Sequence, residues 1–175
     1  VDATNQSILE LSQEAVSLLA WSVEQLGDNF AIAGFNSNTR EQVMYYHIKG
    51  YSEHWDDTVK ARLASLKAEY STRMGAAIRH GAHYLDLQKS DKKLMLILTD
   101  GEPSDVDVND SEMLIKDTHK AVQECQQKGM YPYCISLDNK ADDYISDVFG
   151  SHYSVIDKIE SLPKELPQVF LSLTK

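Results

Sequence analysis

The sequence predicts an α/β fold: a doubly wound, mostly parallel sheet with helices on both faces and one antiparallel hairpin at its edge. Strand-like and helix-like segments alternate along all 175 residues, with no linker, repeat or low-complexity stretch. The segment Leu94–Thr99 is apolar on both faces, which is typical of a central parallel strand that is covered on two sides. Only the polar residues 37–42 separate two strand-like segments, which is too short a connection for a crossover helix and indicates a hairpin.

Helices are predicted where apolar residues recur every three or four positions. The first covers residues 8–26, and Gly27 ends it. Two further long helices begin at Ser71 and Ser111, and Gly129 follows the second of them. The remaining helices are a short one opened by Asp56 and Asp57, one at 141–149, and a last one that starts beside Pro163.

Strands are predicted at five places, and a sixth is expected outside this sequence. The five are 30–36, 43–49, 94–99, 131–137 and 152–156. Sheets of this class commonly have six strands, and here the first element is a helix. We therefore expect residues 1–175 to form a single domain, the C-terminal part of a longer protein, that lacks its first, central strand.

The composition excludes several classes of function. The formal net charge is −10, whereas nucleic acids and anionic membranes bind basic surfaces. The longest uninterrupted apolar run, 94–98, is far shorter than the roughly 20 residues that span a bilayer. The first seven residues show no signal-peptide pattern, and the expected compartment is the cytoplasm. Cys125 and Cys134 form no metal-binding spacing and are interpreted as small core residues.

An acidic segment follows the predicted central strand, at the end where open α/β sheets bind ligands. Residues 99–112 contain six acidic residues and no basic one. One interpretation is a solvated loop whose Asp110 or Ser111 caps the next helix. The other is a site for a hard cation, because carboxylates and hydroxyls suit magnesium or calcium. The segment by itself leaves both open.

Motifs of known enzyme classes are absent or incomplete. The eight glycines include no GxG pair, and no Walker A loop or GxSxG elbow is present. The run from Asp105 departs from an EF-hand loop at Asp110 and Lys116, and from a haloacid-dehalogenase motif at Asn109. His80 and His83 lie three apart without an HExxH motif, which favours a plain helix face over a metal site.

Two segments carry a family resemblance: 71–80 (STRMGAAIRH) and 96–103 (LILTDGEP). They resemble a von Willebrand factor A (VWA) domain. The chain is more narrowly similar to the nitric oxide reductase activation protein NorD and to CbbO, a subunit of a Rubisco activase. The segments 35–38, 105–108, 149–150 and 162–167 are also similar to that subfamily.

The resemblance implies a metal-ion-dependent adhesion site. In the family this site combines a DxSxS motif after the first strand with a threonine before a helix and an aspartate after the fourth strand. Thr72 and Asp100 match the last two parts, and the DxSxS part has no counterpart in this chain. The implied ion is Mg²⁺, with Mn²⁺ or Ca²⁺ as alternatives, and its binding is expected to be weak or absent in this chain alone. Glu102, Asp105, Asp107 and Arg73 are candidate partner-binding residues around the metal.

The function that the resemblance implies is that of a non-enzymatic adaptor. Such a subunit docks an acidic residue of a target protein for remodelling by a hexameric MoxR-type AAA+ ATPase. The target is Rubisco for a CbbO-like protein and nitric oxide reductase for a NorD-like one. Two alternatives are a magnesium-dependent hydrolase that uses the acidic loop 100–112 and an adhesion-type VWA binding domain.

Overall fold

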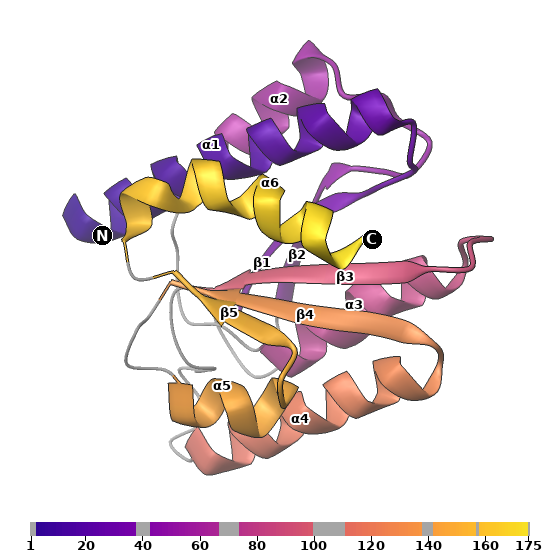
Figure 1. Ribbon diagram of the computed structural model, residues 1–175, viewed down its shortest axis with the longest axis vertical. Helices are drawn as coiled ribbons and strands as arrows, with labels where there is room; N and C mark the ends of the chain where they lie inside the picture. Colours follow the sequence, from indigo (N-terminus) through magenta and orange to yellow (C-terminus); the bar gives the residue numbers. More distant parts are fainter. Residues whose placement is uncertain are drawn as a thin grey trace. The chain divides into compact units, whose positions relative to one another are not determined.

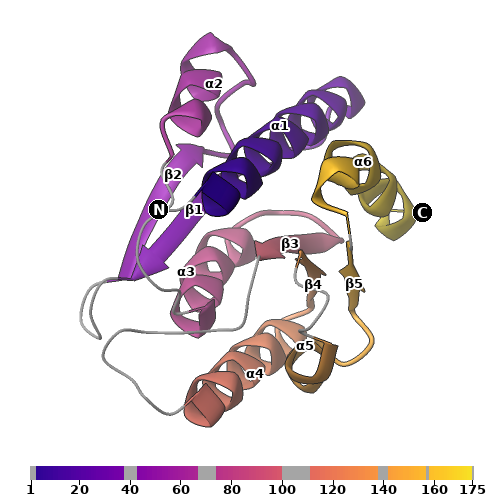
Figure 2. The same cartoon turned by 90° about the vertical axis from the view of Figure 1, so that its left-hand side faces the viewer.

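A computed structural model describes residues 3–37, 43–66, 74–99, 111–137, 142–156 and 158–174 (Figure 1). The chain divides into two compact units. Unit 1 comprises Val1–Gly34, Tyr46–Glu69 and Lys158–Lys175, and unit 2 comprises Phe35–Tyr45 and Tyr70–Asp157. The predicted hairpin is present: β1 (Ile32–Ser37) and β2 (Val43–Lys49) pair as an antiparallel ribbon that contributes to both units (Figure 2).

Unit 1 is built mainly from helices. Its long helix α1 (Ala3–Leu26) packs along α6 (Leu162–Leu173), which follows the short 3-10 turn η1 (Ile159–Ser161). The shorter helix α2 (Asp57–Ala64) completes the unit. Helix α1 begins five residues earlier than its apolar periodicity predicts, because residues 3–7 contain no glycine or proline that would stop a helix. Gly27 ends it with a φ of 79°.

The core of unit 1 lies between α2, β2 and α1. Ile48, Val59 and Leu63 are almost fully buried there, and a ring of partly buried apolar residues surrounds them: Val16, Ile32, Trp55 and Leu66. Both ends of α2 are satisfied by side chains. The Asp56 carboxylate accepts from the Val59 N–H at 3.0 Å, and Gln13 of α1 donates to the Leu63 and Leu66 carbonyls at 3.0 and 3.2 Å. The contacts of Gln13 therefore tie the end of α2 and Leu66 to α1.

Lys49 is the unusual polar member of this unit, because it is only 2% exposed. Its Nζ donates to the carbonyls of Phe30 and Gly50 at 2.8 and 3.1 Å and lies 4.0 Å from the centroid of the Phe30 ring. Burial lowers the pKa of this ammonium group, while the nearby carboxylates of Glu24 and Glu53 oppose the shift. Lys49 therefore ties the end of β2 to the turn that follows α1.

Unit 2 contains the parallel sheet. Its strand order is β3 (Lys93–Thr99), β4 (Met130–Ser136) and β5 (Tyr153–Val155). Strand β4 pairs with both of the others and is central among the described strands. The register pairs Lys93 with Met130 and Thr99 with Ser136. Helices α3 (Met74–Asp86), α4 (Ser111–Gln127) and α5 (Asp142–Phe149) lie side by side along one face of this sheet (Figure 2).

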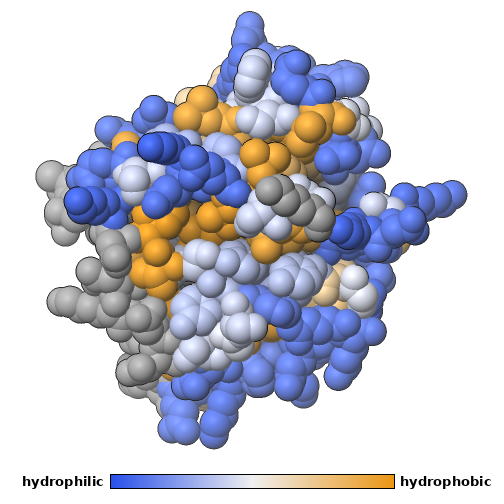
Figure 3. Space-filling model, in the orientation of Figure 1, coloured by the Kyte–Doolittle hydropathy of each residue, from blue (hydrophilic) through white to orange (hydrophobic). Residues whose placement is uncertain are grey.

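The core of unit 2 forms where these three helices meet the sheet. Ile135, Ile145 and Val148 are at most 2% exposed, and Cys125 and Cys134 are equally buried. The outward side of α4 carries hydrophilic side chains, as the lower part of Figure 3 shows. The α/β class, the antiparallel hairpin and the interpretation of both cysteines as small core residues are thus confirmed. Among the described helices, none is both long and apolar enough to cross a membrane.

We predict that both thiols are unreactive in the folded protein. Burial raises the pKa of Cys134 to about 12 and also raises that of Cys125, so both are protonated at pH 8, and only the thiolate attacks alkylating reagents. Iodoacetamide at pH 8, followed by mass spectrometry, should modify neither residue in buffer and both in guanidinium chloride. Rapid labelling of the native protein would contradict the burial of Cys125 and Cys134 in the core of unit 2.

Candidate functional site

The carboxyl ends of all three parallel strands meet at one edge of the unit 2 sheet (Figure 1). Two hydrogen bonds continue the pairing past the strands themselves. The Leu137 N–H donates to the Thr99 carbonyl, and the Ile156 N–H donates to the Ser136 carbonyl, both at 2.9 Å. Ser136 is fully buried at this edge. The last residues of β3, β4 and β5 are therefore held in register at the edge where such sheets bind ligands.

The predicted site residues lie next to this edge in the sequence but outside the residues that the structure describes. Asp100 directly follows Thr99, the last residue of β3, and Thr72 comes two residues before Met74, the first residue of α3. The candidate partner-binding residues Arg73, Glu102, Asp105 and Asp107 also lie outside the described residues, as does Asp110, one of the two predicted helix caps. Helix α4 does begin at Ser111, as its pattern predicts.

The first turn of α3 is held in place by α4. Met74 is 1% exposed, and the backbone of Gly75 lies so close to α4 that an added Cβ would come within 2.4 Å of Asp117 Oδ2. One turn further along α3, the Arg79 guanidinium donates to Asp117 Oδ1 at 3.0 Å, to the Asp117 carbonyl at 3.3 Å, and to Glu124 Oε2 at 3.0 Å. Gly75 therefore lets α3 and α4 approach closely, and the guanidinium of Arg79 joins them through several hydrogen bonds.

The electrostatics of this junction favour the charged arginine. Burial by itself would lower the pKa of Arg79, but the hydrogen bonds and charges of Glu124 and Asp117 outweigh it, and the net effect raises the pKa. The three side chains are between a third and a half exposed, so solvent screens each pair. The main effect of the junction is to fix the position of α3 relative to α4, because the planar guanidinium of Arg79 contacts Asp117 through both its carboxylate and its carbonyl.

Sequence reasoning did not single out the junction of Arg79, Asp117 and Glu124. A signal was available: the two acids are seven residues apart and so share a face of α4, and Arg79 comes shortly after the small residues 75–77 on α3. Which helices would become neighbours was not readable from either pattern. The pairing of the basic residue with the acidic face follows only from the α3–α4 packing.

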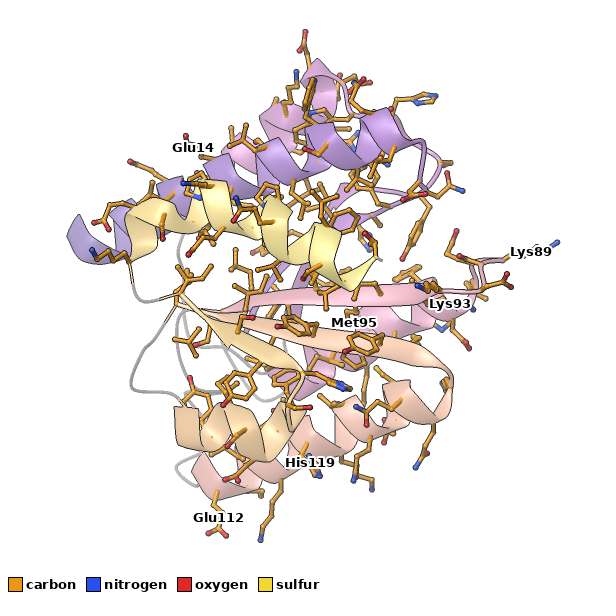
Figure 4. All side chains as sticks on the ribbon, viewed as in Figure 1. Glu14, Lys89, Lys93, Met95, Glu112 and His119 are labelled. Carbon is orange, nitrogen blue, oxygen red and sulfur yellow. The ribbon has the colours of Figure 1, made fainter. Side chains whose placement is uncertain are left out.

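The histidines of α3 make ring contacts. The centroid of the His80 ring lies 4.2 Å from that of Tyr45 on β2 and 5.4 Å from that of Tyr84. The rings of His83 and Tyr84 form a T-shaped pair with their centroids 5.3 Å apart. Within the described ranges, no three His, Cys, Asp or Glu side chains gather in a way that could hold a metal ion. The first turn of α4 carries Glu112, which points away from the sheet and pairs with Lys116 at 3.4 Å (Figure 4).

Comparison with known proteins shows which family this chain belongs to. Residues 2–160 match the model of the von Willebrand factor type A domain, so the chain belongs to that family. The NorD protein of Stutzerimonas stutzeri is 35% identical over 150 residues, which cover 85% of this chain and 24% of that protein. NorD of Brucella melitensis is 35% identical over 170 residues, or 97% of this chain and 27% of that protein.

An uncharacterized protein of Pseudomonas aeruginosa is 34% identical over 96% of this chain and 28% of its own length. This chain therefore spans about a quarter of the length of these relatives. Two solved structures share the fold. A von Willebrand factor type A protein from Catenulispora acidiphila superposes with a TM-score of 0.64 at 16% identity, covering 92% of this chain and 37% of that one. BatB from Bacteroides thetaiotaomicron gives 0.63 at 14% identity, with 95% and 88% covered.

Proposed function

We propose that this chain is the docking domain of an accessory, non-enzymatic subunit that presents a target protein to a MoxR-type AAA+ ATPase hexamer. The observation that carries the proposal is the edge described above, where the end of β3 adjoins Asp100 in a VWA domain whose relatives include NorD. The sequence motifs of nucleophilic and nucleotide-binding enzymes are absent, which supports a docking role over a catalytic one. The cytoplasm supplies the ATP that such a motor consumes.

The docking chemistry that we propose is a shared magnesium ion, with Mn²⁺ or Ca²⁺ as substitutes. The Thr72 hydroxyl and the Asp100 carboxylate are hard oxygen donors, which is the ligand chemistry that Mg²⁺ requires. Thr72 would bind the ion, and Asp100 would accept hydrogen bonds from its water ligands and add negative charge. An acidic residue of the target would complete the coordination, while Arg73, Glu102, Asp105 and Asp107 would shape the surrounding surface.

The remaining donors would come from a segment that precedes Val1. We propose that this segment supplies the first central strand and the DxSxS serines, and that residues 1–175 are one part of the completed domain. The target is either nitric oxide reductase or Rubisco. Because two of the three relatives named above are NorD proteins, nitric oxide reductase is the first target to test.

We predict that capture of the partner depends on magnesium and on both proposed ligands. The protein extended upstream of Val1 should be immobilised and exposed to a cognate MoxR-type ATPase with nitric oxide reductase or Rubisco, in Mg²⁺ or in EDTA. Thr72→Ala and Asp100→Ala should each reduce capture at least tenfold, because each removes one oxygen donor or its charge. Immunoblotting of the eluted proteins measures the effect and identifies the target.

Two substitutions of the same chemistry serve as controls. Thr58 on α2 and Asp91, which precedes the opposite end of β3, are exposed, and Thr58→Ala and Asp91→Ala should leave capture unchanged. Capture that persists in EDTA and in both site variants would show that the domain binds through another surface. Turnover of a phosphate ester that Asp105→Asn abolishes would favour the hydrolase alternative instead.

A second prediction concerns the metal alone. Residues 1–175 lack the DxSxS donors, so isothermal titration with Mg²⁺ should show weak binding or none, whereas the protein extended upstream should bind one ion. Titration of each protein after EDTA treatment and dialysis makes the comparison. Stoichiometric binding by residues 1–175 would mean that the upstream donors are dispensable.

A further inference from the structure

Helix α1 of unit 1 turns two large apolar side chains toward solvent: Trp21 is 58% exposed and Leu18 is 45% exposed. Both belong to a row of exposed positions along one face of α1, which we call the outward stripe: Glu10, Glu14, Leu18, Trp21 and Gln25. We infer that the outward stripe is the docking surface for a basic amphipathic helix of the same polypeptide, from the region that precedes Val1. No residue of the stripe belongs to the proposed metal site, so the two proposals stand apart.

The fold of unit 1 does not require apolar residues on this stripe. The opposite face of α1 is the one that is buried, with Ala15, Ala20 and Val23 at most 6% exposed. Helices α2 and α6 flank α1 on its two sides (Figure 2). The solvent face of such a helix is normally polar. A single exposed leucine is common, but a leucine and a tryptophan three residues apart are neighbours on the helix and form a continuous apolar patch.

The pattern of the stripe fits a helical occupant with basic residues. Its last four positions are spaced four, three and four residues apart, which is the spacing by which two helices pack along each other. Glu14 projects outward from α1 (Figure 4) and lies about 6 Å before Leu18 along the helix axis, with Glu10 one turn further. Helix α1 contains no lysine or arginine. An occupant that covers the apolar patch therefore meets carboxylates at this end, which favours lysine or arginine opposite them.

The patch is too small to hold two free molecules together. Covering the exposed parts of Trp21 and Leu18 buries on the order of 200 Å², because a whole aromatic side chain buries about 150–250 Å². A stable interface buries roughly 800 Å² on each partner. Charge also disfavours a second copy of this chain, since each copy has a formal net charge of −10.

A tether makes so small a surface sufficient. A segment of the same polypeptide meets the stripe at an effective concentration of about a millimolar, so a weak contact is occupied. The curated relatives have the length for such a segment, because this chain matches only 24–28% of them. Helix α1 is also the first element of the chain, so a preceding region joins unit 1 at the start of this helix. Docking on the stripe would fix the orientation of the VWA domain relative to that region.

The test places a photo-crosslinking residue on the stripe of the full-length protein. p-Benzoylphenylalanine in place of Gln25 reacts on irradiation with C–H groups that lie against the stripe, and mass spectrometry of the linked peptides identifies their source. The expected result is linkage to a segment that precedes Val1 and contains lysine or arginine. Trp21→Ala and Leu18→Ala should each lower the yield by about fivefold or more, because each removes apolar contact. Glu14→Lys should do the same by reversing the charge.

Matched controls separate docking from general effects of substitution. Gln123 is an exposed glutamine on α4, and the same crosslinker there should give no linkage to that segment. Leu87 is 66% exposed and Asp91 is also exposed, both in unit 2. Leu87→Ala and Asp91→Lys should leave the yield from position 25 unchanged. Circular dichroism verifies that each variant is folded, and Leu18→Ala decides the matter if Trp21→Ala does not fold.

The other possible occupants are outcomes of the same experiment. Irradiation of a mixture of ¹⁵N-labelled and unlabelled protein reports a second copy, because labelled peptides then join unlabelled ones, and this result overturns the inference. Linkage that requires an added partner protein overturns it as well. So does the absence of linkage from position 25, or a yield that neither Trp21→Ala nor Leu18→Ala lowers. A yield that Glu14→Lys leaves unchanged overturns the basic character of the occupant.

Discussion

The parallel pairing of β3 with β4 is the constraint on which unit 2 depends. It runs from Lys93 opposite Met130 to Thr99 opposite Ser136, and hydrogen bonds at Leu137 and Ile156 extend the alignment past the strand ends. Because the strands are parallel, each connection needs a helical crossover: α4 joins β3 to β4, and α5 joins β4 to β5. Together with α3, which precedes β3, these helices cover one face of the sheet. The carboxyl ends therefore meet at one edge, where the chain can gather polar groups that are far apart in the sequence.

The packing of α3 against α4 is set by contacts of a different kind from those of the sheet. The apolar core holds the helices against the sheet but does not specify how far one helix slides along its neighbour. Directional contacts do so here: a glycine lets α3 approach α4, and Arg79 binds two acids of α4 through separate nitrogens. Such half-exposed ion pairs contribute little to stability individually. Their value lies in selecting one arrangement of the two helices.

Unit 1 uses polar contacts in a comparable way around its turns. Lys49 ties the end of β2 to the turn after α1, and Gln13 holds the carbonyls at the end of α2. The carboxylate of Glu53 accepts from the Gly50 N–H at 2.8 Å and binds Arg62, and the Gly50 N–H is the largest cause of the lowered pKa of Glu53. These groups satisfy backbone atoms that the short elements leave without partners.

The sequence by itself determined the α/β class, the antiparallel hairpin, the strand at 94–99 and the family, because periodicity and local motifs are readable residue by residue. In the described sheet, however, β4 and not β3 is central, and most of β3 is only partly buried, because strand order depends on which strands pair in the fold. The sequence also placed both cysteines in the core. The start of α1 was not predicted, since residues 3–7 carry no apolar period. The site residues inferred from the family resemblance, Thr72 and Asp100 among them, remain predictions. Only the tertiary structure decided that Arg79 meets Asp117 and Glu124, because such a contact depends on which helices pack together, and residues 38 and 45 positions apart carry no shared local signal.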